Sequence, residues 1–263
     1  MRIQGSTVLL TGATGGIGHA IARALGARGA SLILTGRRTE VLGPLAEELR
    51  ARSIAVDLTS AEEVDRLVAE AGPVDILIAN AALPGSGMLA DLSVVDIDRA
   101  LAVNLRAPIV LTRALSPAMV SRRSGHLLYI SSLAGKVSAP GASIYNATKF
   151  GLRGFASAMR TELRSSGVGV SSIFPGFISD AGMFADTGLD LPAGVGTRTP
   201  EEVAEAVVSA IERNRGEVDV APLPLRAGAR LAGFAPELSH TLTRKLGGEE
   251  IARKMAAAQT DKR

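Results

Sequence analysis

Tyr145 and Lys149 are the two residues whose types and spacing point most directly to chemistry. Residues four apart share one face of a helix, so the phenol and the ammonium would lie side by side there. An ammonium about 4 Å away contributes about 4 kcal/mol at an effective dielectric constant of about 20, enough to move a tyrosine pKa from about 10 toward neutrality. The pair therefore predicts a proton donor or acceptor that works near neutral pH.

A glycine-rich stretch gives the second chemical signal. Residues 11–18 directly follow a short apolar run and open a helical pattern. Glycines let the backbone approach a pyrophosphate, and the first turn of a helix offers free N–H groups and the positive end of the helix dipole. The stretch lacks the Gly-Lys-Ser/Thr ending of a triphosphatase loop. We therefore predict a dinucleotide-binding turn.

These residues must be positioned by elements that alternate along the chain. Short apolar runs predict strands at 7–10, 31–34, 54–56, 74–78, 126–130, 168–173 and 218–220. Helix-period segments lie between them, at 17–28, 39–51, 60–71, 93–122, 143–165 and 200–213. Capping-box patterns begin at Ser60 and at Thr199. The alternation predicts an α/β fold, a doubly wound parallel (Rossmann-like) sheet flanked by helices on both faces, in one domain over 1–263.

The spacing of several residues resembles the short-chain dehydrogenase/reductase family, in its short, single-domain branch. Ser132 lies thirteen residues before Tyr145, and Asn104 lies inside the helix expected at 93–122. The stretches Asn80-Ala81-Ala82 and Pro175-Gly176 each follow an expected strand. The likeness extends from residue 5 to about residue 220.

This resemblance implies roles for four residues. Tyr145 would be the acid/base, and Lys149, with an oxidised nicotinamide, would lower the tyrosine pKa and also hold the nicotinamide ribose. Ser132 would hydrogen-bond the substrate oxygen. Asn104 would position a water in the proton relay.

The resemblance also implies a nicotinamide cofactor. The residues expected to contact it are Gly12, Thr14, Gly15, Gly16, Ile17, Gly18, Arg37, Arg38, Asp57, Leu58, Asn80, Ala81, Tyr145, Lys149, Pro175, Gly176 and Ile178. Two positions depart from the family pattern, since Asp180 stands where a Thr is common and Ala82 replaces a Gly. Asp57 also fits a simple turn before Ser60, and this alternative stays open.

The expected cofactor is NADP(H) in preference to NAD(H). Gly36 occupies the position after the second strand where an NAD enzyme usually places a carboxylate on the ribose hydroxyls. Arg37 comes next and can pair with a 2′-phosphate, assisted by Arg38. Charge-assisted hydrogen bonds of this kind contribute about 1.5–3 kcal/mol, or roughly 10- to 150-fold in affinity.

We therefore expect hydride transfer between a nicotinamide and an alcohol or carbonyl substrate. The lid-like segment 176–199 carries apolar side chains that favour an apolar substrate, namely Phe177, Ile178, Met183, Phe184 and Leu189. Two alternatives stay open. Gly12, Gly15 and Gly18 also fit the epimerase-like spacing, so an isomerase or epimerase is one. A non-catalytic NAD(P)-binding sensor is the other.

Composition narrows the class of protein. The 263 residues carry a net charge of +3 and contain no Cys, which excludes a disulfide scaffold and a thiolate metal site. The three histidines lack metal-ligand spacing, so no metal is expected. Only 3% of residues are aromatic and the basic residues are dispersed, so no nucleic-acid partner is expected. Because the sequence has no long apolar stretch, we expect no transmembrane segment. We expect the protein to be cytoplasmic and to form a homodimer or homotetramer.

A C-terminal extension, 222–263, follows the last expected strand. Its apolar residues come close to helical spacing, at Leu231, Phe234, Leu238, Leu242 and Leu246, among several basic residues. Such a segment can cover the substrate cleft, pack on a partner subunit or lie on a membrane surface. Packing is the favoured interpretation, and peripheral membrane contact stays open.

Overall fold

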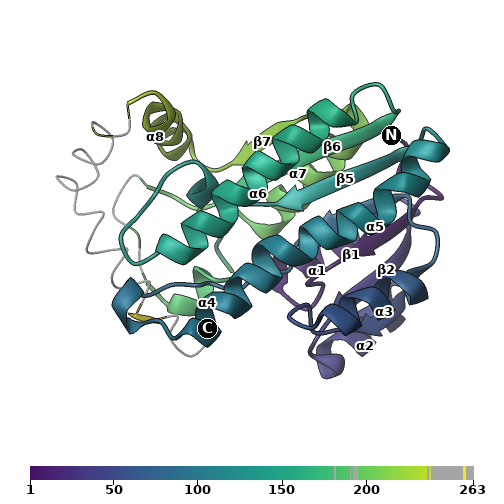
Figure 1. Cartoon of the computed structure of the whole chain (residues 1–263), viewed down its shortest axis with the longest axis horizontal. Coiled ribbons are helices and arrows are strands. Elements are labelled where there is room, and N and C mark those ends of the chain that lie inside the picture. Colours follow the sequence, from purple (N-terminus) through teal and green to yellow (C-terminus); the bar gives the residue numbers. More distant parts are fainter. Residues whose placement is uncertain (181, 190, 192–194, 236, 238–256, 259–263) are drawn as a thin grey trace.

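Seven strands form one sheet in the order β3-β2-β1-β4-β5-β6-β7, with helices on both faces (Figure 1). The computed structural model describes residues 1–263 except 181, 190, 192–194, 236, 238–256 and 259–263. The strands are β1 (Thr7–Leu10), β2 (Ser31–Gly36), β3 (Arg52–Ala55), β4 (Ile76–Ala79), β5 (Gly125–Ile130), β6 (Val168–Pro175) and β7 (Glu217–Val220). All pairings are parallel, which confirms the predicted doubly wound sheet. The strand order reverses between β1 and β4, where such folds bind ligands.

The helices alternate with the strands as predicted, with one exception. They are α1 (Gly16–Gly26), α2 (Thr39–Glu48), α3 (Ala61–Ala71), α4 (Val94–Leu101), α5 (Ala107–Ser121), α6 (Ser143–Glu162), α7 (Pro200–Arg213) and α8 (Leu223–Phe234). The exception lies within the helix predicted over 93–122: the backbone is helical from Val94 to Ser121, but a π-helical turn, Ala102–Arg106, stands between α4 and α5. Pro108 accounts for this turn, since it has no N–H to donate to the carbonyl of Asn104 four residues earlier.

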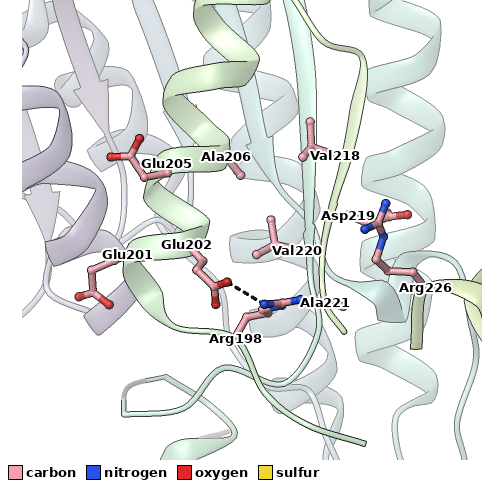
Figure 2. A pocket seen from close by; sticks show the side chains of 10 residues that line it. All are labelled: Arg198, Glu201, Glu202, Glu205, Ala206, Val218, Asp219, Val220, Ala221 and Arg226. Carbon is pink, nitrogen blue, oxygen red and sulfur yellow. Dashed lines mark hydrogen bonds and ion pairs between the residues drawn. The ribbon is translucent and has the colours of Figure 1, made fainter. Parts of the chain in front are cut away.

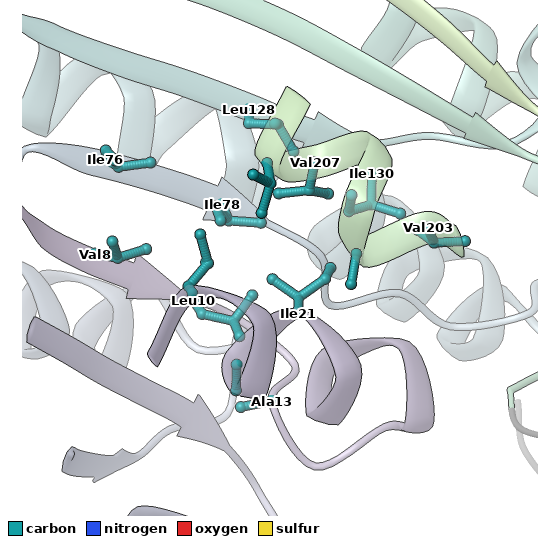
Figure 3. Packing of buried hydrophobic residues seen from close by; sticks show 14 of the residues in the cluster. Val8, Leu10, Ala13, Ile21, Ile76, Ile78, Leu128, Ile130, Val203 and Val207 are labelled. Atoms are coloured by element: carbon teal, nitrogen blue, oxygen red, sulfur yellow. The ribbon is translucent and has the colours of Figure 1, made fainter. Parts of the chain in front are cut away.

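Two apolar cores cover the two faces of the sheet. Successive strand residues point to opposite faces, so Leu10 and Leu9 belong to different cores. On one face, strand residues pack against α1 and α7, as Figure 3 shows for Val8, Leu10, Ile76, Ile78, Leu128, Ile130, Ile21, Val203 and Val207. On the other, α3, α5 and α6 contribute Val64, Leu67, Leu111, Leu115 and Leu152. Burial on both faces accounts for the continuous apolar strands of the sequence.

Side-chain caps fix where three of the helices begin. The capping box predicted at Thr199 and Glu202 is confirmed. The one predicted at Ser60 is wrong in one half, because Ser60 accepts the N–H of Glu63 while the Glu63 carboxylate accepts the N–H of Asp57 instead. A further capping box, between Ser93 and Asp96, opens α4.

Candidate active site

Ser132, Tyr145 and Lys149 meet beside the carboxyl end of β5. Ser132 follows β5 and caps a 3₁₀ turn, η3 (Leu133–Gly135), while Tyr145 and Lys149 lie on α6. The Ser132 hydroxyl lies close enough to the Tyr145 phenol to lower its pKa. Lys149 Nζ donates to the Ile130 carbonyl at 3.0 Å and lies 5.5 Å from the centroid of the Tyr145 ring. The structure thus brings these three sequence-predicted side chains together.

Burial dominates the electrostatics of the pair. It raises the pKa of Tyr145 to about 12, against the opposing effect of the nearby Ser132 hydroxyl. It lowers the pKa of Lys149 to about 8. Because the loss of hydration disfavours the charged form of each group, the phenol keeps its proton at neutral pH. These side chains by themselves therefore favour proton donation by Tyr145.

Asn104 lies in the π-helical turn, and its side chain is fully engaged by protein. Its Oδ1 accepts the N–H of Leu83 at 2.7 Å, and its Nδ2 donates to the Leu83 carbonyl at 2.8 Å and to Thr148 Oγ1 at 3.3 Å. Thr148 also donates to the carbonyl of Tyr145 at 2.8 Å. Asn104 therefore links the segment after β4 to α6 at the level of Tyr145.

The glycine-rich turn meets the end of β4 at the point where strand order reverses. Thr11 Oγ1 accepts the N–H groups of Asn80 and Ala81 at 3.0 and 3.1 Å. The Asn80 amide donates to the carbonyls of Thr11 and Gly12, each at 3.0 Å. A Cβ on Gly12 would lie 2.6 Å from Ala81 Cα, so the close approach requires glycine. Sequence reasoning gave Thr11 no role, although it directly precedes Gly12.

The start of α1 suits an anion. Its N-cap, Gly15, makes no side-chain cap, and its first turn contains no acidic residue. In contrast, α3, α4 and α7 are each capped by a Ser or Thr and carry acidic residues in the first turn. A Cβ on Gly15 would meet nothing nearer than 3.7 Å, whereas one on Gly18 would lie 2.3 Å from the Gly12 carbonyl oxygen. Space beside Gly15 and uncapped N–H groups fit the pyrophosphate of a dinucleotide.

Comparison with known proteins agrees with this geometry. The profile of the short chain dehydrogenase family matches residues 6–191. The chain belongs to the short-chain dehydrogenase/reductase family. It is an oxidoreductase of that family, with the family's Rossmann-like, nucleotide-binding fold.

Several relatives of this short-chain dehydrogenase are similar over most of their length. The ketoacyl reductase HetN of Nostoc sp. is 39% identical over 232 residues, which are 85% of this chain and 81% of HetN. Dehydrogenase/reductase SDR family member 7B of Xenopus laevis is 35% identical, over 90% of this chain and 80% of that protein. A short-chain dehydrogenase from Sphingobium yanoikuyae, solved in complex with NADPH, has a TM-score of 0.77 at 27% identity, over 90% of this chain and 95% of that chain. These neighbours support a nicotinamide cofactor.

At the end of β2, this short-chain dehydrogenase presents two exposed arginines. Arg38 Nη2 donates to the carbonyl of Thr14, beside Gly15. Arg37 lies close enough to Asp57 to act on its carboxyl group. The two guanidinium groups therefore flank the glycine-rich turn and the end of β3.

Asp57 forms the turn that sequence reasoning left as an alternative. Its Oδ1 accepts the N–H and the hydroxyl of Thr59 at 3.0 and 2.9 Å. Although burial acts to raise it, the pKa of Asp57 is lowered by these hydrogen bonds and by the charges of Arg37 and Arg99. Leu58, the next residue, is buried.

Pro175 ends β6, and Gly176 donates its N–H to the Val220 carbonyl at 3.0 Å. A Cβ on Gly176 would lie 2.9 Å from Ala221 Cβ, so a larger residue would push β7 aside. Ile178 is buried and forms an isolated bridge with Arg198.

The segment after Ile178 departs from the family pattern. Asp180 has a φ of 63° and accepts a hydrogen bond from the Ser179 hydroxyl at 2.6 Å. Its carboxylate is therefore engaged by its own neighbour.

A pocket of about 480 Å³ lies between α7, β7 and α8 (Figure 2). Its lining residues are Arg198, Glu201, Glu202, Glu205, Ala206, Val218, Asp219, Val220, Ala221 and Arg226. The Arg198–Glu202 ion pair, at 2.8 Å, forms part of the wall. None of the predicted catalytic or cofactor residues lines it, so this pocket is separate from the site built on Tyr145.

The described residues contain neither a metal-ligating cluster nor a membrane-spanning helix. No group of three or more His, Asp or Glu side chains there is placed to hold a metal ion. No described helix combines the length and apolar character needed to cross a bilayer. In the C-terminal extension, α8 contains Leu231 and Phe234, while Leu238, Leu242 and Leu246 lie outside the described residues.

Proposed function

We propose that this oxidoreductase reduces an apolar carbonyl compound with NADPH. The observation that carries the proposal is the grouping of Tyr145 with Ser132, which is close enough to lower the pKa of the phenol, and with Lys149 beside the phenol ring. The site couples a proton donor to a hydroxyl that can hold the substrate oxygen. A carbonyl that accepts hydride at carbon must gain a proton at oxygen, and this pair supplies it.

In this mechanism, the bound nicotinamide supplies the hydride. Ser132 and Tyr145 both hydrogen-bond the carbonyl oxygen, and Tyr145 donates its proton as negative charge develops there. A Tyr145 pKa of about 12 keeps the proton available at neutral pH. Lys149, whose pKa is about 8, is mostly protonated at pH 7 and stabilises the phenolate that remains. The reverse reaction, oxidation of an alcohol, would first require removal of the proton from this same phenol.

We assign the proton supply to water at the break between α4 and α5. Both ends of the Asn104 side chain bind protein, so the side chain itself is not the water ligand. The Asn104 main-chain carbonyl lacks a partner from Pro108, and carbonyl oxygens in such breaks bind water or side chains. We therefore propose that Asn104 takes part in the relay through its backbone carbonyl.

The proposed cofactor preference is for NADP(H) over NAD(H). Gly36 offers no carboxylate to repel a 2′-phosphate, and Arg37 and Arg38 are exposed at the same strand end. Direct comparison of the dissociation constants of NADPH and NADH tests this preference. Tighter binding of NADH would overturn it.

The substrate is proposed to be an acyl-chain carbonyl compound or another apolar ketone or aldehyde. Phe177 and Phe184 of the lid-like segment pack with ring centroids 5.0 Å apart, which provides an apolar surface. The relative named ketoacyl reductase makes β-ketoacyl thioesters the first class to screen. NADPH consumption against thioesters, ketones and aldehydes, for wild type and for Tyr145→Phe, tests the proposal.

The same screen separates the alternatives. Product isomerisation without net NADPH consumption would indicate an isomerase or epimerase. Tight NADPH binding with no turnover on any member of the panel would indicate a sensor.

We also propose that residues 176–199 act as a lid. The base of this segment is fixed, because Ser179 donates its N–H to the Arg198 carbonyl at 2.9 Å and Arg198 donates to the Phe177 carbonyl at 3.0 Å. The intervening residues include glycines at 182 and 188 with positive φ. Amide hydrogen exchange over 182–189 should slow when NADPH is added. Equal, strong protection with and without cofactor would count against a lid.

For the C-terminal extension, we propose packing on a partner subunit in a homodimer or homotetramer. Leu223 and Phe234 on α8 are 72% and 91% exposed. Replacing both with Ser should lower the sedimentation coefficient without changing liposome binding. Loss of liposome binding at an unchanged oligomeric state would favour membrane contact instead.

A further inference from the structure

Lys136 ties the turn that begins at Ser132 to the edge strand of the sheet. It directly follows η3, and its N–H donates to the Leu133 carbonyl at 2.8 Å, which closes the turn. Its Nζ lies 2.6 Å from Asp219 Oδ1 and 2.9 Å from Glu217 Oε2, both on β7. The position of η3 is thereby linked to β7 through one ammonium group.

Two further elements of the site share this cluster. Lys136 Nζ lies 3.9 Å from the centroid of the Phe174 ring, a cation–π contact, and Phe174 immediately precedes Pro175. Arg153 on α6 binds Glu217, with 2.7 Å between Nε and Oε1. The cluster therefore joins η3, the end of β6, β7 and the helix that carries Tyr145.

The ion pair between Lys136 and Asp219 is more deeply buried than the other ion pairs between described residues. The side chains of Lys136 and Asp219 are 10% and 9% exposed, the lowest values for any ion pair between described residues. A buried pair is a weak source of net stability, because the loss of hydration offsets the attraction. Removing one partner, however, leaves an unpaired buried charge. The pair therefore restrains geometry more than it adds stability.

We infer that Lys136 is a positioning residue that holds Ser132 at its distance from Tyr145. The inference rests on the catalytic role proposed for Ser132. Ser132 Oγ donates to the Pro175 carbonyl at 3.5 Å and accepts the N–H of Ala134 at 3.1 Å, so the serine moves with η3. A displacement of about 1 Å in a catalytic constellation can cost about 10²-fold in rate.

Lys136→Met in the full-length protein is the central variant, because it removes the ammonium and keeps most of the stem. We expect kcat for acetoacetyl-CoA reduction to fall about 10- to 100-fold. The NADPH dissociation constant, followed by cofactor fluorescence, should change much less than kcat, since the glycine-rich turn lies at other strands. Amide exchange over residues 133–137 should accelerate.

Three further variants separate positioning from stability. The double variant Lys136→Met/Asp219→Asn leaves no unpaired charge, so its Tm should recover while kcat stays low. Arg23→Met removes a cation from an exposed pair with Glu48 and should change neither kcat nor the exchange. Lys136→Arg should restore part of the lost turnover.

Unchanged exchange over 133–137 in Lys136→Met would overturn the inference, and this measurement requires no substrate. Wild-type kcat in that variant would overturn it as well, provided that Ser132→Ala is inactive. If Ser132→Ala itself keeps full activity, the proposed catalytic role of Ser132 fails, whatever Lys136 does.

Discussion

Gly36 and Thr14 approach each other so closely that position 36 has no room for a side chain. A Cβ on Gly36 would lie 2.7 Å from Thr14 Cγ2 and 3.0 Å from Thr14 Oγ1. Any larger residue at the end of β2 must therefore displace Thr14. Because the Thr14 carbonyl also accepts a hydrogen bond from Arg38, such a displacement would reach the proposed phosphate-binding arginine.

A carboxylate at position 36 should therefore favour NADH binding only when the side chain at position 14 is also shortened. We expect Gly36→Asp alone to weaken binding of both NADH and NADPH, because the new side chain disturbs the turn. Adding Thr14→Ala removes the colliding atoms, so the double variant should bind NADH more tightly than the single one. Fluorescence titration of all four proteins forms a double-mutant cycle. Strictly additive changes in the binding free energy would show that the close approach of Gly36 and Thr14 does not affect cofactor binding.

Loss of either arginine at the end of β2 should weaken NADPH binding selectively. For Arg37→Ala and for Arg38→Ala, we expect a rise in the NADPH dissociation constant of roughly 10- to 150-fold, the range for a lost charge-assisted hydrogen bond. NADH, which lacks the 2′-phosphate, should bind as before. Arg113→Ala, at an exposed position on α5, is the matched control. Equal losses for both cofactors would contradict a phosphate-specific role.

The two tyrosines of the chain provide a matched pair of variants. Tyr145→Phe should lower turnover by about 10²- to 10⁴-fold, the usual contribution of a positioned acid, while NADPH binding changes little. Tyr129 is fully buried, and its hydroxyl lies 2.8 Å from Thr112 Oγ1. Tyr129→Phe should therefore cost about 1 kcal/mol of stability and keep turnover. Near-wild-type turnover in Tyr145→Phe would contradict the mechanism proposed above.

The sequence predicted the sheet and the pairing of Tyr145 with Lys149 because both depend on local patterns. Apolar runs mark strands buried on both faces, and Tyr145 and Lys149 share one face of a single helix. The sequence did not predict the π-helical turn at Asn104, although Pro108 was visible. Helical periodicity alone does not show which carbonyl loses its donor.

The roles of Lys136 and Thr14 required the three-dimensional structure. Asp219 lies 83 residues after Lys136, and Thr14 lies 22 residues before Gly36. No spacing rule connects such pairs, since their contacts depend on strand order and on how loops close. The pKa of Tyr145 likewise depends on burial, which residue types at four-residue spacing do not specify.

Reductive turnover should decline as pH rises through about 8. The lowered pKa of Lys149 means that it loses its proton there, and a neutral amine stabilises the Tyr145 phenolate poorly. A kcat profile from about pH 6 to about pH 10 should show this decline. Lys149→Arg keeps its charge throughout that range, so any turnover it retains should not decline near pH 8. A wild-type kcat that does not change over this pH range would show that the charge of Lys149 is not needed for the proton transfer.

His126 should make the fold sensitive to mild acid. Its imidazole is 1% exposed, and its Nε2 lies 2.9 Å from Ser171 Oγ. Burial, with smaller contributions from the N-terminal ammonium and Arg160, lowers the pKa of His126 to about 3. In the unfolded chain the pKa is about 6.5, so below that pH the unfolded state binds a proton that the native state does not. The free energy of unfolding should then fall by about 1.4 kcal/mol per pH unit from this group between about pH 6.5 and about pH 3.

His126→Gln isolates that contribution, because it keeps a polar end near Ser171 and removes the titration. Carboxylates that also titrate in this window are present in both proteins and cancel in the comparison. Urea unfolding at several pH values from about 7 to about 4 should therefore show a steeper loss of stability in wild type than in the variant. The absolute stability of His126→Gln at neutral pH is expected to be lower, since its packing against Gly169 changes, so only the slope with pH is diagnostic. Equal slopes in the two proteins would mean that His126 is not buried in its neutral form.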